Sequence, residues 1–293
     1  MKRVLRWIGY VVAALAAAAL LFVAWVWFAS ARVLGRTHEA RPEPLALPTA
    51  AQLADAERQS RILGCHSCHG EGMRGRMMFE APNVVRMWAP NIPELAARAS
   101  DQQLARAIRQ GIGHDGRALF AMPSPLYQRL SDQEVAAMIA YIRRLPPAGE
   151  ATPGIEWGPI GRFALAIGSF PSAVDRMEEF RRRQPFDLGP AYAPGRRLVS
   201  IQCADCHGPD LSGAEPIPGT FSPGLDVAAA YSPEQFRALM RTGVAPHGRD
   251  LGMMREAALQ DLRHYSDAEI DQIHAYLVAR AGRVQDPPPG PRD

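Results

Sequence analysis

The sequence predicts a mainly α-helical chain in which two tandem domains of related design follow an N-terminal transmembrane helix. A long uncharged apolar run lies near the N-terminus. A five-residue motif with two cysteines and a histidine occurs at residues 65–69 and again at residues 203–207. Ser100 and Gly111, typical of a helix start and a helix stop, recur with the same spacing as Ser232 and Gly243. Because self-similarity on this scale indicates duplication, we expect two copies of one helical domain.

Residues 1–31 begin with basic residues and continue as an uncharged run from Trp7 to Ala31. A bilayer is crossed by ~20 apolar helical residues. The basic residues before the run predict a cytoplasmic N-terminus, an inner-membrane anchor and export of the remainder to the periplasm. A cleaved signal peptide is the alternative, since Ala29-Ser30-Ala31 fits a cleavage site. The run is, however, longer than a typical signal core of ~7–15 residues.

The net charge of +3 is concentrated near the N-terminus. Five basic residues precede Glu39, the first acidic residue, and the remainder holds 28 basic against 30 acidic residues. The domains therefore have no basic field that would attract nucleic acid.

The order of segments follows from composition. Residues 32–53 contain three prolines and predict an extended tether. We expect a first domain at 54–147, a connector at 148–189, a second domain at 190–283 and a disordered tail at 284–293. Within these, the glycines and prolines of 70–99 and of the connector predict loops.

Four serines predict helix starts. Each is followed three residues later by Glu or Gln, as in a capping box; the pairs are Ser100 with Gln103, Ser131 with Glu134, Ser232 with Gln235, and Ser266 with Glu269. Gly111 and Gly243 predict the ends of the first helix in each copy. A further helix over 54–64 is expected to lead into the first cysteine motif.

The repeated motif predicts the cofactor. Its copies are Cys65-His-Ser-Cys68-His69 and Cys203-Ala-Asp-Cys206-His207, and they contain all four cysteines. C-x-x-C-H is the attachment signature of a c-type haem. The thiols form thioethers to the porphyrin, and the adjacent histidine is the proximal iron ligand. We therefore expect two covalently bound haem c groups. A zinc site or two disulfides are the alternatives, but each cysteine pair has its own histidine and its own downstream methionine.

The second axial ligand is expected to be methionine, which raises the haem potential and suits electron transfer. Met122 and Met254 occupy equivalent positions when the two copies are aligned on their capping serines, and Gly116-Arg117 then lies opposite Gly248-Arg249. Met253 is the near alternative to Met254. These methionines could instead pack in the core, or a nearby histidine could ligate the iron; the histidines in question are His114 and His247.

Two further roles are expected around the haems. The second ring nitrogen of each proximal histidine needs an acceptor, and the backbone carbonyls of Pro90 and Pro223 lie in matching loops. Arg117 and Arg249 could pair with haem propionates, or could be ordinary surface residues.

The phrase AMPSPLYQRLSDQEVAAMIAYIRRLPP (121–147), together with GVAPHGRDLGMM and YSDAEIDQIHAYL in the second copy, resembles class I c-type cytochromes. It is similar to the cytochrome c subunits of membrane-bound bacterial dehydrogenases, and the resemblance covers most of 54–283. Those subunits carry three haem motifs, whereas this chain has two. The resemblance implies electron relay, with substrate chemistry performed elsewhere.

The sequence thus predicts a membrane-anchored dihaem cytochrome. It would relay electrons from a dehydrogenase or quinol-oxidising partner to a terminal oxidase, a quinone or a soluble carrier. No constellation of general base and nucleophile is evident, so we expect an electron-transfer subunit without catalytic residues of its own. The alternatives are a dihaem enzyme of the peroxidase or thiosulfate-oxidising type with one open haem site, and a dihaem subunit of a haem–copper oxidase.

Overall fold

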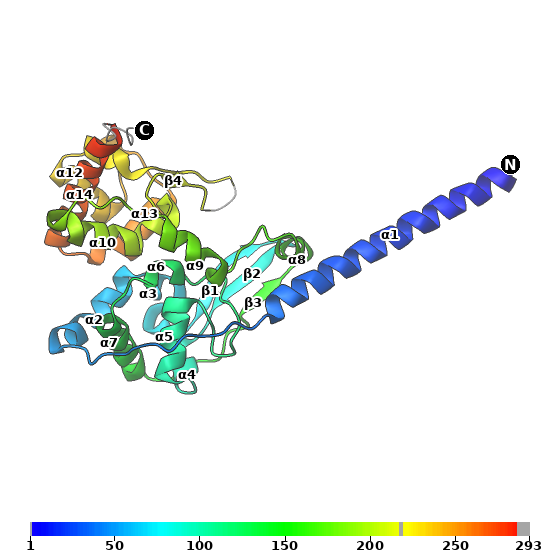
Figure 1. Cartoon of the computed structure of the whole chain (residues 1–293), viewed down its shortest axis with the longest axis horizontal. Coiled ribbons are helices and arrows are strands. Elements are labelled where there is room, and N and C mark those ends of the chain that lie inside the picture. The colour runs from blue at the N-terminus through cyan, green and yellow to red at the C-terminus, as the bar shows by residue number, and fades with distance from the viewer. Residues whose placement is uncertain (1, 217–218, 286–293) are drawn as a thin grey trace, which may run out of the picture.

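A computed structural model describes residues 2–216 and 219–285, except for the side chains of residues 247, 284 and 285. Helix α1 (Lys2–Gly35) extends away from the remainder of the molecule (Figure 1). The prediction of a mainly α-helical chain is confirmed. The first helical unit contains α2 (Ala50–Ile62), α3 (Cys65–His69), α4 (Ile92–Ala96), α5 (Asp101–Gln110), α6 (Ser124–Tyr127) and α7 (Asp132–Arg144). The second contains α10 (Ala193–Gln202), α11 (Ala204–His207), α12 (Pro233–Thr242), α13 (Met253–Gln260) and α14 (Asp267–Gln285).

The predicted capping boxes start α5, α7, α12 and α14. In α7, for example, the backbone N–H of Glu134 donates to Ser131 Oγ at 3.3 Å. Gly111 and Gly243 end α5 and α12 with φ of 68° and 67°, a left-handed conformation that favours glycine. A fifth capping box at Thr49 starts α2 at Ala50, four residues before the predicted start.

The prediction of a loop over 70–99 is wrong. Strands β1 (Arg76–Ala81) and β2 (Val85–Ala89) form an antiparallel hairpin within it. Asn83 turns the chain at a φ of 62°, which Asn tolerates better than most residues. Along β2, buried positions alternate with more exposed ones, as in a strand with one buried face. The Gly and Pro residues around this hairpin favour a loop, and the alternating pattern of β2 extends over only five residues, so the strand was not predicted.

The connector is also more ordered than predicted. Strand β3 (Ile155–Trp157) adds to β2 and gives a sheet in the order β1-β2-β3. Helices α8 (Pro159–Ala166) and α9 (Ala173–Arg182) follow it. Gly161 allows close packing here, because a Cβ at this position would lie 2.1 Å from the carbonyl oxygen of Val84. The arginines at 181–183 are exposed and pair with nearby carboxylates on the surface.

The predicted tether is extended, but it is bound along the first unit. The side-chain amide of Gln102 accepts from the N–H of Glu43 at 2.9 Å and donates to its carbonyl at 2.7 Å. The side-chain amide of Gln110 likewise accepts from the N–H of Arg41 and donates to its carbonyl. The buried Glu43 carboxylate pairs with Arg109, which also bonds Asp132 at 2.6 Å. We call this bound segment, residues 36–48, the strap.

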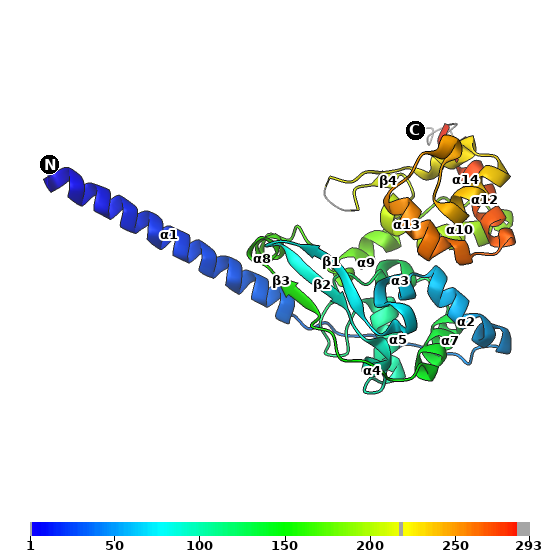
Figure 2. The same cartoon turned by 180° about the vertical axis from the view of Figure 1, so that it is seen from behind.

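The two helical units pack against each other (Figure 2). One continuous hydrophobic cluster includes buried residues of both. Within the part of the chain that the structure describes, two ion pairs cross the boundary: Arg58 with Glu269 at 2.8 Å and Arg197 with Glu134 at 2.5 Å. Helix α14 continues through Gln285, and the remainder of the predicted tail, 286–293, lies outside the described residues.

Candidate functional site

The first motif sits on a short helix that follows α2 after a tight turn. Gly64 makes this turn at a φ of 73°, and α3 then carries Cys65, Cys68 and His69. Residues three apart lie on the same side of a helix, so the two thiols are placed together. Tyr127 donates a short hydrogen bond to the carbonyl of Leu63 and ties α6 to this turn.

His69 is buried, and its Nδ1 lies 2.9 Å from the carbonyl oxygen of Pro90. A carbonyl only accepts, so Nδ1 carries the proton and Nε2 keeps its lone pair. Burial lowers the pKa of His69 and keeps the imidazole neutral. Only a neutral imidazole can bind iron.

The second motif repeats this arrangement. Helix α10 leads through Cys203 into α11, which carries Cys206 and His207. Nδ1 of His207 lies 2.8 Å from the carbonyl oxygen of Pro223, and burial lowers the pKa of this histidine as well. Both predicted histidine–carbonyl hydrogen bonds are therefore confirmed.

The turns after the two histidines are also alike. The N–H of Met73 bonds the carbonyl of Gly70 at 2.9 Å, and the N–H of Leu211 bonds that of Gly208 at 2.9 Å. Met73 and Leu211 are fully buried at positive φ, 55° and 64°. A buried non-glycine residue in this conformation is uncommon, and its occurrence in both copies indicates one loop design.

The methionine loops share several backbone hydrogen bonds at equivalent positions. The N–H of Gly113 bonds the carbonyl of Arg117 at 2.8 Å, and at the equivalent positions of the second copy the N–H of Ala245 bonds that of Arg249 at 3.0 Å. The bridge between Ile112 and Ala118 recurs between Val244 and Asp250 in the same register. The register predicted from the sequence thus holds in the structure as far as Asp250, close to Met254.

Burial separates the candidates for the sixth ligand. Met122 and Met254 are half-buried and pack against the hydrophobic core, whereas Met253 is 47% exposed. His114 is exposed on the loop between α5 and α6. The other candidate histidine, His247, has its side chain outside the described residues, and both candidate propionate partners, Arg117 and Arg249, are exposed.

The donor set fits covalently attached haem c. None of the four cysteines forms a disulfide. Burial raises the pKa of Cys65 and Cys203 to about 12, so both sites favour a neutral sulfur, and a thioether is neutral. Among the described residues, no cluster of three or more His, Cys, Asp or Glu side chains has the arrangement of a metal site built from those residues alone. Each motif thus offers two thiols and one imidazole nitrogen oriented by a carbonyl.

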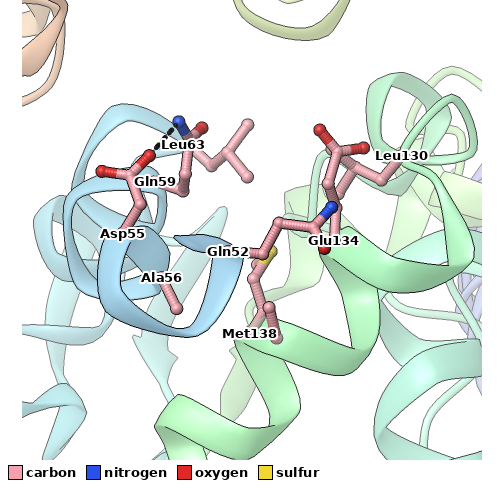
Figure 3. Close-up of a pocket in the computed structure, with 9 residues that line it drawn as sticks. Gln52, Asp55, Ala56, Gln59, Leu63, Leu130, Glu134 and Met138 are labelled. Atoms are coloured by element: carbon pink, nitrogen blue, oxygen red, sulfur yellow. Dashed lines mark hydrogen bonds between the residues drawn. The ribbon is translucent and has the colours of Figure 1, made fainter. Parts of the chain in front are cut away.

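A cavity lies between α2 and α7, and none of its lining residues belongs to either motif (Figure 3). It holds about 100 Å³, much less than a typical substrate pocket of ~300 Å³ or more. Its two carboxylates are already engaged: Asp55 accepts from Gln59 at 2.9 Å and pairs with Arg58, and Glu134 pairs with Arg197. This cavity therefore has no unengaged carboxylate to act as a general base.

Two residues that lie near the first motif or support it were not predicted from the sequence. Asn91 caps α4 and donates to the carbonyl of Ala148 at 2.9 Å, which fixes the loop that carries Pro90. The pattern Asn91-Ile-Pro-Glu is a helix-start signal that could have revealed this cap. Asp261, from the second unit, faces the turn at Gly64; no local signal predicts that contact.

Family comparisons agree with this geometry. Residues 51–142 match the family model described as cytochrome C oxidase, cbb3-type, subunit III, and residues 192–280 match the model described as cytochrome c. The chain therefore belongs to the c-type cytochromes and contains two cytochrome c domains of class I.

Three curated relatives are cytochrome subunits of dehydrogenases. The fructose dehydrogenase cytochrome subunit of Gluconobacter japonicus is 25% identical over 268 aligned residues, covering 79% of this chain and 55% of that protein. The gluconate 2-dehydrogenase cytochrome c subunit of Pantoea cypripedii is 28% identical, with coverages of 75% and 58%. The alcohol dehydrogenase (quinone) cytochrome c subunit of Gluconobacter oxydans is 25% identical, with coverages of 75% and 52%. The chain thus spans little more than half the length of these relatives.

Proposed function

We propose that the protein is a membrane-anchored dihaem cytochrome c that relays electrons between a membrane dehydrogenase and an oxidase, quinone or soluble carrier. The two domains of the relay are 54–147 and 190–283. The observation that carries this proposal is the duplicated site, in which each motif has a histidine oriented by a carbonyl and a methionine loop in matching register. The dehydrogenase partner is inferred from the relatives.

When bound, haem c supplies reversible one-electron chemistry at its iron. In this proposal, Cys65, Cys68, Cys203 and Cys206 hold the two porphyrins, and His69 and His207 provide the proximal nitrogens. Met122 and Met254 provide the sixth ligands. The carbonyl–imidazole bonds would keep both rings in one tautomer and orientation, which would limit reorganisation during electron transfer.

The anchor is α1, which is long and apolar enough to cross a membrane, although a signal sequence would pass the same test. Retention of α1 is supported by contacts near its C-terminal end. Val26 and Ser30 are buried in the folded chain, and the Arg162 guanidinium lies 3.8 Å from the Trp27 ring centroid. Cleavage after Ala31 would remove these contacts. We propose an inner-membrane location with the haem domains in the periplasm.

A dihaem subunit of a haem–copper oxidase is the second candidate. It is favoured by the family model matched by residues 51–142, whose description names an oxidase subunit. Affinity purification of the full-length protein from membranes distinguishes the two. A copurifying dehydrogenase subunit supports the first proposal, and a copper–haem subunit supports the second.

The ligand assignment is tested by spectroscopy of the oxidised full-length protein. We expect a methionine–iron charge-transfer band in the near infrared from both haems. Met254→Ala should remove half of this band and let that haem bind cyanide, whereas Met253→Ala, the matched control, should leave both properties unchanged. A bis-histidine spectrum would contradict the ligand assignment, and ready cyanide binding by the unaltered protein would favour a dihaem enzyme.

A further inference from the structure

Helix α8 packs on α1 at one restricted place. The Phe163 and Phe22 rings lie 5.9 Å apart, and Arg162 donates to Ser30 Oγ at 3.2 Å while covering the Trp27 ring. The side chains of α1 are otherwise mostly exposed. Figure 1 shows α8 beside the end of α1 that meets the domains. The contact therefore fixes α8 at one level along the anchor.

That level corresponds to the outer boundary of a membrane. A helix rises ~1.5 Å per residue and crosses the ~30 Å hydrocarbon core in ~20 residues. A span that starts at Trp7 therefore ends near Val26. Trp25 and Trp27 lie at this end, as aromatic residues do at membrane interfaces, and Ser30 lies one turn beyond. Helix α8 thus lies beside the point where α1 leaves the bilayer.

Part of α8 is apolar and uncovered. Ile160 and Phe163 of α8, and Ile167, the residue that follows its C-terminal end, are 55%, 38% and 53% exposed. The spacing of three residues places Ile160 and Phe163 on one side of the helix. The opposite side is attached to the protein: Leu165 is buried, and the N–H of Ile160 donates to the carbonyl of Asn83 at 2.9 Å.

The surrounding sequence suits an apolar boundary. Residues 157–174 contain one charged side chain, Arg162, and no acidic residue. The exposed apolar side of α8 is continuous with the apolar surface of α1 through the Phe163–Phe22 contact. A helix with an apolar side and low charge can lie in the plane of the interface with that side in the acyl boundary.

We propose that α8 is an interfacial helix, and that its exposed apolar side chains, Ile160 and Phe163, insert together with that of the following residue, Ile167, into the lipid leaflet from which α1 emerges. This inference rests on the proposed role of α1 as a membrane anchor. The occupant of the surface is the phospholipid bilayer itself. Two elements, α1 and α8, then attach the protein to the membrane, and the first domain has a fixed orientation relative to the bilayer.

The fixed orientation extends to the first haem motif. Helix α8 bonds the turn between β1 and β2, and β2 ends at Ala89, directly before the carbonyl that orients His69. The strap connects the same domain to α1 by a separate route. The distance and tilt of the first haem site relative to the bilayer are thereby set by folded structure.

Photolabelling of the full-length holoprotein tests this proposal. The probe is a phospholipid with a diazirine in its acyl chain, in nanodiscs of phosphatidylcholine and phosphatidylglycerol, and the labels are mapped by mass spectrometry. We expect labelling of α1 and, several-fold above the reference positions, of α8. The references, Val227 and Val278, are 49% and 41% exposed on the second domain.

Labelling of α1 without α8 would overturn the interfacial helix and leave the anchor intact. Labelling of neither would overturn the anchor and the inference with it. Cross-linking of an unlabelled α8 to a copurifying membrane subunit would show that protein, and not lipid, covers this side.

As a second readout, amide exchange at 158–168 should be slower in nanodiscs than in a non-inserting amphipathic polymer. The triple variant Ile160→Asn/Phe163→Asn/Ile167→Asn should lose this difference in exchange rate. The control variant Val227→Asn/Val278→Asn should keep it. If the difference persists in the triple variant, these side chains do not insert into the bilayer.

Discussion

At the residue scale, the carboxyl of Asp261 is the least expected feature near the first haem motif. It comes from the turn after α13, and a Cβ placed on Gly64 would lie 3.4 Å from its Oδ2. Its Oδ1 is buried without a hydrogen-bond partner. Burial raises the pKa of Asp261 to about 7, an effect that the hydroxyl of Ser67 partly opposes.

This raised pKa makes stability depend on pH. The folded chain holds the proton of Asp261 at pH values where the unfolded chain, with a pKa near 3.8, has lost it. The contribution of this group to stability therefore falls as the pH rises from about 4 to about 7, by about 2 to 4 kcal/mol.

We therefore expect Asp261→Asn to stabilise the holoprotein, least near pH 4 and most above pH 7. Unfolding of the full-length protein at pH 5 and pH 8 measures the difference, with Glu150→Gln, an exposed carboxyl, as the control. If Asp261→Asn lowers the stability at pH 8, the ionised carboxylate of Asp261 stabilises the folded protein, which would contradict this expectation.

At the element scale, the strap converts a proline-rich tether into part of the first domain. Arg109 has an 11% exposed side chain and is shared by two carboxylates, those of Glu43 and Asp132. Gln102 and Gln110 each satisfy one backbone N–H and one carbonyl of the strap. The backbone polar groups of Arg41 and Glu43 are thus satisfied although these residues belong to no sheet or helix.

Glu43→Ala should release this element. It removes one of the two carboxylates from a buried guanidinium, and we expect a loss of about 2 to 3 kcal/mol. Limited proteolysis within 36–48 and thermal unfolding of the full-length protein measure the effect. Glu39→Ala, an exposed carboxylate in the same segment, is the matched control; equal effects of the two changes would rule out a special role for Glu43.

The elements that were predicted correctly are those with local signals. Capping serines at 100, 131, 232 and 266 mark helix starts because their hydrogen bonds join neighbouring positions in the chain. The His69–Pro90 bond was predictable because the second copy repeats it. The strap and Asp261 were not, since their contacts join positions that lie far apart in the sequence. The hairpin was missed because β2 is only five residues long.

At the scale of the whole molecule, the two domains are joined mainly by apolar packing. The ion pairs that cross the boundary, Arg58 with Glu269 and Arg197 with Glu134, are partly exposed, with side-chain exposures of 21 to 40%. Such pairs contribute ~0–1 kcal/mol each. We expect the hydrophobic cluster, which includes buried residues of both domains, to contribute more, because buried apolar area stabilises by ~25 cal/mol per Å².

The double variant Arg58→Ala/Arg197→Ala should therefore keep the two domains together. We expect a loss of about 2 kcal/mol or less and a single cooperative unfolding transition. Calorimetry and small-angle scattering of the full-length protein, compared with the unaltered protein, check both points. Two separate transitions, or an expanded particle, would show that the ion pairs hold the interface.

The central claim is that one chain carries two covalently bound haems, one on each motif. Mass spectrometry of the denatured full-length protein tests it most directly, because thioether-bound haem survives denaturation. The predicted result is a mass increase of two haems, which falls to one haem in Cys65→Ala/Cys68→Ala and, equally, in Cys203→Ala/Cys206→Ala. A chain that carries one haem or none, after maturation in a host that exports and assembles c-type cytochromes, would contradict the account.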